Sequence, residues 1–296
     1  MFNFIKKLFS PIIGILDFIT KYFKTIVFLT IIYFVVYSGN NANDINVSGG
    51  SANLQKINLY GQISDVSKVL EQINMAKKDD NIKGVLFVVN SPGGSVAPSV
   101  ELAYAIKELK ELKPVVVYAS GVMASGSYYA SIWANKIIAN PGSMVGSIGV
   151  IMQGINAKEL MDKIGISSQV VKAGKYKEMG AYNRLWEDYE KAQLQSVIDD
   201  TYKMFINDVA KARKLKVEEH TIYADAKIFT ASQAKKVGLV DEVATMSYAK
   251  SNLVKLAKVD KAIWKKQDKF ERFMDKILQE TINKVSTIFM TQLKAI

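Results

Sequence analysis

From residue 54 onwards, short runs of apolar residues alternate with longer stretches whose apolar positions recur at helical spacing. The short runs carry almost no polar residue, which is typical of strands in a sheet that is buried on both faces. Alternation of strands with helices predicts βαβ units, and therefore an α/β fold built on a mostly parallel sheet. The predicted strands cover residues 57–60, 85–89, 114–118 and 137–139, and the predicted helices between them cover residues 64–78 and 96–112.

The second half of the chain has longer polar stretches between its apolar runs. We expect a helix over residues 157–164, a strand over 169–172 and a long amphipathic helix over 186–214. Residues 229–241 predict a short helix that a glycine ends, followed by another strand. Residues 258–296 have apolar residues at near-helical spacing among many lysines, which predicts an amphipathic helical tail. Such a tail could pack on its own domain, on another subunit, on a membrane or over a functional site.

The first 53 residues differ from the rest and predict membrane attachment. Residues 25–37 carry no charge, and with residues 22–24 they approach the length of a transmembrane core. A cleaved signal peptide and a buried helix are alternatives, but the long basic start and poor cleavage site favour an uncleaved anchor. Residues 1–24 are expected in the cytoplasm or on the membrane surface, and residues 38–53 as a linker. Lysines before the anchor place the N-terminus in the cytoplasm and the later residues outside.

The composition excludes several classes of site. The chain has 296 residues, of which 49% are hydrophobic, so one sizeable packed domain with extensions is expected. The absence of cysteine excludes a thiol nucleophile and disulfides, and a single histidine, His220, excludes multi-histidine metal sites. His220 lies in a charged stretch and is expected at the surface. The net charge of +11 comes from scattered lysines without an aromatic and basic RNA motif, so the expected partner is an anionic membrane and not nucleic acid.

The candidate chemistry centres on the stretch from Ser120 to Tyr129, Ser-Gly-Val-Met-Ala-Ser-Gly-Ser-Tyr-Tyr. It follows the strand at 114–118 and opens an apolar helix over 128–134, so we expect Ser125 where the strand turns into the helix. A hydroxyl there lies near the unpaired N–H groups of the helix start, and Gly126 lets a substrate backbone approach. A serine nucleophile requires these features, although a turn of small residues for close helix–strand packing explains the same pattern.

Two further segments could complete such a site. The loop Asn90-Ser-Pro-Gly-Gly94 follows a predicted strand, and its backbone N–H groups suit an anion or an oxyanion. If the strands before the two loops are neighbours, both loops lie at the carboxyl edge of the sheet, where such folds bind ligands. The nucleophile also needs a base, and lysine is the obvious residue left. An ordinary lysine has a pKa of about 10.4 and must be desolvated to act as a base. The segment 172–180 offers Lys172, Lys175 and Lys177.

Together these motifs resemble the signal peptide peptidase A family. The resemblance covers residues 54–257 and rests on the order and spacing of five motifs. The motifs are Asn90–Gly94, Ala124–Tyr129, Gly146–Val150, Ala173–Glu178 and Thr230–Asp241. The resemblance implies a membrane-anchored Ser/Lys serine protease with a Clp-protease/crotonase-like fold, in the family's short form with one catalytic domain.

The resemblance also implies a role for each matching residue. Ser125 matches the nucleophile, and Lys177, which lies between a tyrosine and a glutamate, matches the general base. The backbone N–H groups of Gly94 and Gly126 match the oxyanion hole. Ser147 matches a serine that hydrogen-bonds the lysine. The position two residues after the nucleophile is often glycine in the family and is Ser127 here.

Substrates, partners and location follow from the same resemblance. The expected substrates are signal-peptide remnants and other unfolded apolar peptides at the membrane, cleaved without a cofactor or metal. The catalytic domain is expected on the periplasmic or external side of a bacterial inner membrane. The family further implies a homo-oligomeric ring in which one subunit's lysine serves its neighbour's serine, whereas the rival arrangement is a self-contained site. The alternative functions are a crotonase-type acyl-CoA enzyme and a non-catalytic membrane scaffold with a decayed protease domain.

Overall fold

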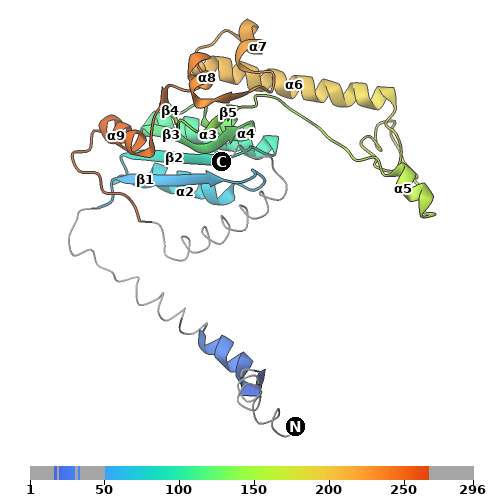
Figure 1. The fold of residues 1–296 in the computed structure, drawn as a ribbon, viewed down its shortest axis with the longest axis horizontal. Coiled ribbons are helices and arrows are strands. Elements are labelled where there is room, and N and C mark those ends of the chain that lie inside the picture. The colour runs from blue at the N-terminus through green and yellow to red at the C-terminus, as the bar shows by residue number, and fades with distance from the viewer. Residues whose placement is uncertain (1–16, 19, 31–32, 34–50, 267–296) are drawn as a thin grey trace, which may run out of the picture. The chain divides into compact units, whose positions relative to one another are not determined.

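The computed structural model describes residues 17–18, 20–30, 33 and 51–266 (Figure 1). The chain divides into two compact units, residues 1–50 and 51–296. In the first unit residues 20–30 are helical. None of the helices in the described parts of the chain has the length and apolar character needed to cross a membrane. The predicted anchor over residues 25–37 lies partly outside the described residues and stays a prediction.

From β1 to β4 the second unit alternates strands and helices in the order that the sequence predicts, as the labels in Figure 1 show. The strands are β1 (Leu54–Tyr60), β2 (Gly84–Ser91), β3 (Val115–Ala124), β4 (Lys136–Ala139), β5 (Met144–Gly146), β6 (Ile228–Thr230) and β7 (Glu242–Val243). The helices are α2 (Ser67–Lys78), α3 (Val96–Leu112), α4 (Gly126–Ser131), α5 (Lys158–Lys163), α6 (Asp188–Arg213), α7 (His220–Tyr223), α8 (Ala231–Lys236) and α9 (Met246–Ala257).

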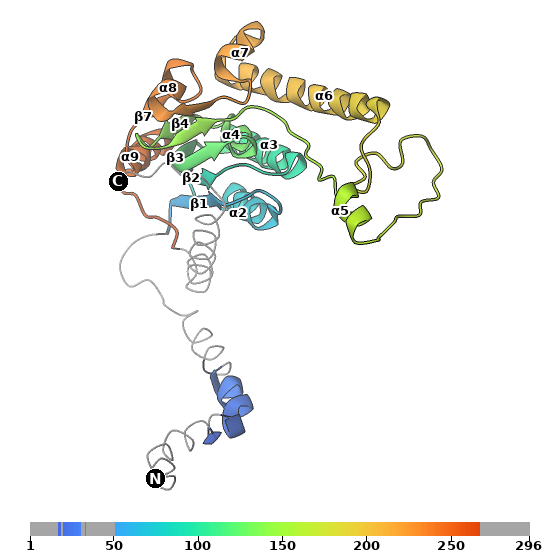
Figure 2. The ribbon, with the colours of Figure 1, turned by 45° about the vertical axis from the view of Figure 1, so that its right-hand side comes forward.

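The strands form one seven-stranded sheet with the path β1-β2-β3-β4-β7, and Figure 2 shows β1 to β4 side by side. All pairs on this path are parallel. The far end of β3 also pairs in parallel with β5, and β5 pairs antiparallel with β6. The predicted α/β fold with a mostly parallel sheet is therefore confirmed. Because β2 and β3 are neighbours, the loops that follow them emerge at the same edge of the sheet.

Both faces of the sheet are covered, which explains the continuous apolar runs. Alternate residues of β2, such as Val85 and Phe87, belong to a core cluster shared with α2, α3 and α4. Their neighbours, such as Leu86 and Val88, belong to a second cluster formed with α9. Successive side chains of a strand point to opposite faces, so a strand between two helical layers must be apolar at every position.

The segment between β5 and α6 differs most from the prediction. It carries α5 and extends away from the sheet towards the N-terminal end of α6, as Figures 1 and 2 show. The predicted strand at 169–172 is wrong, because these residues form an exposed loop with no sheet partner in the described chain. We call residues 150–187 the arm. Helix α6 follows it and matches the predicted helix over 186–214 to within two residues.

The described start of the predicted tail is bound to its own domain. Lys265 N–H donates to Leu54 O over 2.7 Å, and Asn53 N–H donates to Ile263 O over 2.8 Å. Leu54 and Trp264 form a parallel bridge, so this segment continues the sheet beyond β1. Residues 267–296, the rest of the predicted amphipathic tail, lie outside the described residues.

Candidate active site

Ser125 lies between the last residue of β3 and the first residue of α4, as the sequence predicts. Its backbone has φ 53° and ψ −126°, a left-handed conformation that is costly for any residue with a side chain. Two backbone hydrogen bonds fix this turn, because Ser125 N–H donates to Gly146 O over 2.8 Å and Ser125 O accepts from Tyr129 N–H over 3.0 Å. A strained serine at a sharp strand-to-helix turn is the arrangement by which α/β-hydrolases expose their nucleophile.

The loop after β2 packs directly against this turn. A Cβ atom on Gly93, whose φ is +94°, would lie 2.7 Å from the Gly126 nitrogen and 2.8 Å from the Ser125 Cβ. A Cβ on Gly126 would lie 3.5 Å from the Gly94 nitrogen and 2.2 Å from the Ser99 hydroxyl oxygen. Only glycine fits such close approaches. The structure thus brings the predicted oxyanion-hole residues, Gly94 and Gly126, next to each other and to Ser125.

Ser127 joins the two loops from inside the core. Its hydroxyl is fully buried, donates to Ser91 O over 2.7 Å and accepts from Ala124 N–H over 2.9 Å. The side chain therefore bonds the end of β2 to the end of β3 below the turn. The Ser127 hydroxyl, where the family often has glycine, thus has a structural role here, and Ser127 does not line the cavity that contains Ser125.

An open cavity of about 100 Å³ lies beside Ser125 and the two glycines. Its wall is mostly apolar and comes from α3, α4, α6 and the start of the arm. Besides Ser125, Gly94 and Gly126, the cavity is lined by Val96, Ser99, Val100, Tyr129, Gly149, Val150, Ile151, Thr201, Met204 and Phe205. A cavity of this kind accepts an apolar side chain next to the Ser125 hydroxyl. The described residues contain no cluster of His, Cys, Asp or Glu suited to a metal ion.

Tyr129 connects the helix of the candidate nucleophile to α6. Its hydroxyl donates a short hydrogen bond to the Asp208 carboxylate, and its ring meets Phe205 edge to face with 4.8 Å between centroids. Burial, and next the bond to Asp208, raise the pKa of the Tyr129 hydroxyl far above its ordinary value. Tyr129 is therefore a neutral donor that attaches α4 to the wall of the cavity.

Ser147 lies close to Ser125 along the backbone. The Gly146 carbonyl that accepts from Ser125 N–H directly precedes it, and Ser147 N–H donates to Lys227 O over 2.6 Å. Ser147 also has a positive φ, 50°, and is half-buried. The turn that supports it includes Ala226, with a φ of 53°, whose N–H donates to Ile148 O over 2.9 Å. Ser125 and Ser147 thus occupy two strained turns joined by one hydrogen bond.

The three candidate lysines have different surroundings on the arm. Lys172 forms an ion pair with Glu178 at 2.8 Å. Lys175 lies over the Tyr189 ring, with its ammonium 4.3 Å from the centroid. Lys177 is exposed, and within residues 51–266 its side chain has no hydrogen-bond, ion-pair or ring partner. Lys177 is also absent from the wall of the cavity that contains Ser125. One chain therefore does not bring Lys177 to the Ser125 cavity.

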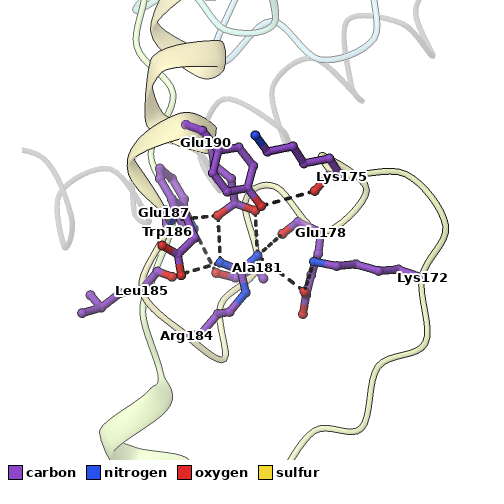
Figure 3. A network of polar contacts seen from close by, with 10 residues as sticks. Lys172, Lys175, Glu178, Ala181, Arg184, Leu185, Trp186, Glu187 and Glu190 are labelled. Carbon is purple, nitrogen blue, oxygen red and sulfur yellow. Dashed lines mark hydrogen bonds and ion pairs between the residues drawn. The ribbon is translucent and has the colours of Figure 1, made fainter.

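A polar network fixes the arm around these lysines (Figure 3). The Glu190 side chain has no exposed surface and accepts two bonds from the Arg184 guanidinium, at 2.8 Å and 2.7 Å. It also accepts from Glu187 N–H over 2.9 Å, which completes a capping box at the start of α6. The Arg184 hydrogen bonds and then the Glu187 N–H lower the pKa of Glu190 to about 2. Arg184 in turn donates to the backbone oxygen of Glu178 over 3.3 Å.

Known protein families match the part of the chain that contains this site. The family model of peptidase family S49 matches residues 107–260, which is just over half of the chain, and a Clp protease model matches residues 41–145. A protein of Enterococcus faecium described as a signal peptide peptidase SppA is 31% identical over 250 residues, which cover 79% of this chain and 73% of that protein. The chain belongs to peptidase family S49. It is thus an SppA-type chain with a Clp-like fold, as the sequence motifs predict.

Two further relatives support the family assignment. A protein described as a protease in Methanocaldococcus jannaschii is 46% identical over 198 residues, which cover 67% of this chain and 64% of that protein. A chloroplastic serine protease SPPA of Arabidopsis thaliana is 30% identical over 227 residues, which cover 72% of this chain and 34% of that protein. The chain thus spans just under two thirds of the first relative and about a third of the second.

The network at the start of α6 predicts how the arm of this S49 chain responds to acid. Because the pKa of Glu190 is lower in the folded chain than its usual 4.5, the carboxylate stabilises the arm above about pH 4.5, and this stabilisation is lost as the pH falls towards about 2. We expect pepsin to cut residues 172–186 progressively faster over this range. The uncharged variant Glu190→Gln should show only the pH dependence that pepsin itself shows on an unfolded control peptide. Equal cutting of both proteins at pH 4.5, with unchanged circular dichroism, would contradict the prediction.

Sequence reasoning missed the contacts that α6 makes with the site. The cavity wall residues of α6 and the Asp208 partner of Tyr129 lie about 80 residues from Ser125 along the chain, and no local motif announces them. A signal for the arm network was present, because Glu187 and Glu190 have the spacing of a capping box before an amphipathic run. The partner of Glu190, Arg184, carries no such signature.

Proposed function

We propose that this chain is a serine endopeptidase in which Ser125 is the nucleophile and Lys177 is the general base. The observation that carries the proposal is the strained turn at Ser125, placed against Gly94 and Gly126 at the mouth of an apolar cavity. Functional sites are where such backbone strain is usually found. The unengaged side chain of Lys177, beside two lysines that have partners, supports its choice as the base.

The proposed reaction is acyl transfer through a covalent intermediate. Neutral Lys177 accepts the proton of the Ser125 hydroxyl as its oxygen attacks the peptide carbonyl carbon. The N–H groups of Gly94 and Gly126 donate to the carbonyl oxygen as it becomes negatively charged. The protonated lysine then donates to the leaving amine, and water hydrolyses the acyl-enzyme with Lys177 again as the base. Ser147, fixed next to Ser125, is proposed to orient the lysine by a hydrogen bond. No cofactor is involved.

The proposed substrates are unfolded apolar peptides, including signal-peptide remnants left in a membrane. The apolar wall of the cavity supports this class, because it offers a side chain such as leucine or valine a dry contact next to Ser125. Extended, unfolded segments can reach a hydroxyl that lies in a half-buried turn, whereas a folded domain cannot.

Labelling with a fluorophosphonate separates this proposal from the two alternatives. The probe reacts with activated serine hydroxyls, so we expect one label per chain at Ser125, lost in Ser125→Ala and strongly reduced in Lys177→Ala. A crotonase-type acyl-CoA enzyme would use the same N–H groups without an activated serine and would remain unlabelled. A non-catalytic scaffold would also remain unlabelled. Labelling that persists in Ser125→Ala would overturn the assignment of the nucleophile.

We further propose that residues 25–37 form the core of a single-pass anchor in a bacterial inner membrane, with the N-terminus cytoplasmic. The support is the uncharged run and the lysines that precede it. In intact spheroplasts, added protease is expected to degrade the catalytic domain, while a cytoplasmic marker protein stays intact. Protection of the domain until the membrane is lysed would reverse the proposed orientation.

The proposed assembly is a homo-oligomeric ring in which the arm of one subunit reaches the Ser125 cavity of the next. Two observations support it. Lys177 is not part of its own chain's cavity. The arm also exposes large apolar side chains that water would otherwise contact, including Ile151, Ile155, Val171 and Leu185 at 84%, 80%, 104% and 73% exposure. Exposed apolar surface of this extent marks an interaction site, and burial of the arm would favour the neutral form of an enclosed lysine.

A further inference from the structure

The loop that carries Lys177 has almost no apolar core of its own. Within residues 172–182 only Glu178, Met179 and Ala181 are partly buried, and the others are exposed. Gly174 and Gly180, with φ of +94° and +88°, have open space around them. The path of this loop must therefore be fixed by something other than hydrophobic packing. Polar contacts with the residues around the start of α6 supply that restraint.

These contacts converge on one side-chain pair. The Arg184 guanidinium bonds the buried Glu190 carboxylate through two nitrogens and reaches the Glu178 backbone oxygen at 3.3 Å. Glu178 directly follows Lys177 in the chain, so Arg184 connects α6 to the residue next to the candidate base (Figure 3). Glu178 is fixed a second time by its ion pair with Lys172.

Two aromatic side chains fix the flanks of the same loop. The Trp186 indole N–H donates to Ala181 O over 2.9 Å, and the Tyr189 hydroxyl donates to Lys175 O over 3.3 Å. The Tyr189 ring also meets the Tyr176 ring edge to face. Residues on both sides of Lys177 are thus bound to Arg184, Trp186 or Tyr189, which lie just before or within the first turn of α6. Among the three lysines of the described loop, Lys177 is the one whose side chain is unengaged.

We propose that Arg184 and Glu190 are positioning residues, which hold the loop at 172–182 on the first turn of α6 so that Lys177 is presented to Ser125. This inference rests on the proposed Ser/Lys function and adds to it the residues that set the geometry of the base. Neither side chain lines the Ser125 cavity or reaches a substrate there. They act through the backbone of Glu178, and a bidentate guanidinium–carboxylate pair suits this role because it fixes both distance and orientation.

Positioning of this kind predicts a particular kinetic pattern. A displacement of about 1 Å in a catalytic group can lower the rate of the chemical step about 100-fold. The apolar cavity that binds the substrate side chain is lined by α3, α4, α6 and the first residues of the arm, all outside the loop at 172–182, and it would be unchanged. Loss of the network should therefore lower kcat and leave KM nearly constant, whereas general destabilisation would lower the amount of folded enzyme or alter both.

The experiment measures peptide hydrolysis by the full-length chain in detergent or lipid, for four variants and the wild type. Arg184→Gln and the double variant Arg184→Gln/Glu190→Gln remove the ion pair, and the double variant leaves no buried charge unpaired. Arg184→Lys keeps the charge but not the bidentate geometry. The matched control is Lys158→Gln, which removes an exposed ion pair with Asp162 elsewhere on the arm.

We expect Arg184→Gln and the double variant to lower kcat by about 10- to 100-fold, with KM within about twofold of the wild type. Arg184→Lys should recover part of this loss, and Lys158→Gln should match the wild type. If the neutral variants fail to fold, Arg184→Lys decides by itself, because its retained charge still pairs Glu190. An unchanged kcat in a folded Arg184 variant, or equal effects on kcat and KM, would overturn the proposal.

The variant Lys177→Ala tests the Ser/Lys chemistry separately from the positioning role of Arg184 and Glu190. If Lys177→Ala retains full hydrolysis, Lys177 is not the base, and both proposals are wrong. If Lys177→Ala is inactive while the folded Arg184 variants keep the wild-type kcat, the Ser/Lys chemistry stands and only the positioning role of Arg184 and Glu190 is rejected.

Discussion

Replacing Ser125 with alanine is expected to lower peptide hydrolysis by about three orders of magnitude or more, because no other group can form the acyl-enzyme. The hydroxyl takes no part in capping α4, so its removal should leave the fold intact. The backbone strain at this position persists with alanine, whose side chain has the same Cβ. The measurement is kcat/KM for an apolar peptide substrate, together with the thermal unfolding temperature.

The matched control for this variant is Ser131→Ala, a serine-to-alanine change at the end of α4, the helix that Ser125 precedes. The Ser131 hydroxyl is buried, donates to Ser127 O over 2.8 Å and does not line the cavity. It should cost some stability and keep most of the hydrolysis. Residual turnover of more than about a tenth of the wild type in Ser125→Ala would contradict the nucleophile assignment. Ser127 could not replace Ser125 as the nucleophile in that case, because its hydroxyl is buried under the turn and bonded to Ala124 and Ser91.

The sequence predicts the sheet and the loops at its edge well, for a physical reason. Strands such as β2 and β3 lie between two helical layers, so every residue from Val85 to Val89 must be apolar, and the run is visible without any knowledge of its partners. The parallel order of the strands then places the loops after β2 and β3 at one edge. This is why Gly94 and Ser125 could be placed together from sequence, and the structure confirms that they are neighbours.

The arm could not be predicted in the same way. Val170 and Val171 gave a strand prediction, but both side chains are exposed on a loop. Local apolarity indicates that a segment will be buried without indicating whether the partner lies in the same chain. Contacts such as Tyr129 with Asp208 are missed for a related reason, because they join residues 79 positions apart whose types are unremarkable where they stand. The assigned roles of Ser125, Lys177, Gly94, Gly126 and Ser147 all stay predictions.

The exposed position of Lys177 on the arm predicts that two inactive variants regain activity when they are mixed. Ser125→Ala chains lack the nucleophile, and Lys177→Ala chains lack the base, so each alone should be inactive. If each site takes Ser125 from one subunit and Lys177 from the next, a mixed ring contains junctions in which both residues are intact. For equal amounts and random assembly this holds at about a quarter of the junctions, because the contact between neighbours is head-to-tail.

We therefore expect mixing, under conditions that allow subunit exchange, to restore hydrolysis to about a quarter of the wild-type value. Fluorophosphonate should then label the Lys177→Ala chains, which carry the intact Ser125, and leave the Ser125→Ala chains unlabelled. Exchange is verified independently by energy transfer between differently labelled subunits. If the site lies within one chain, every site in the mixture remains broken, and no activity returns despite exchange. That result would reject the shared ring and require the arm to fold back, bringing Lys177 from its exposed position to the Ser125 cavity of its own chain.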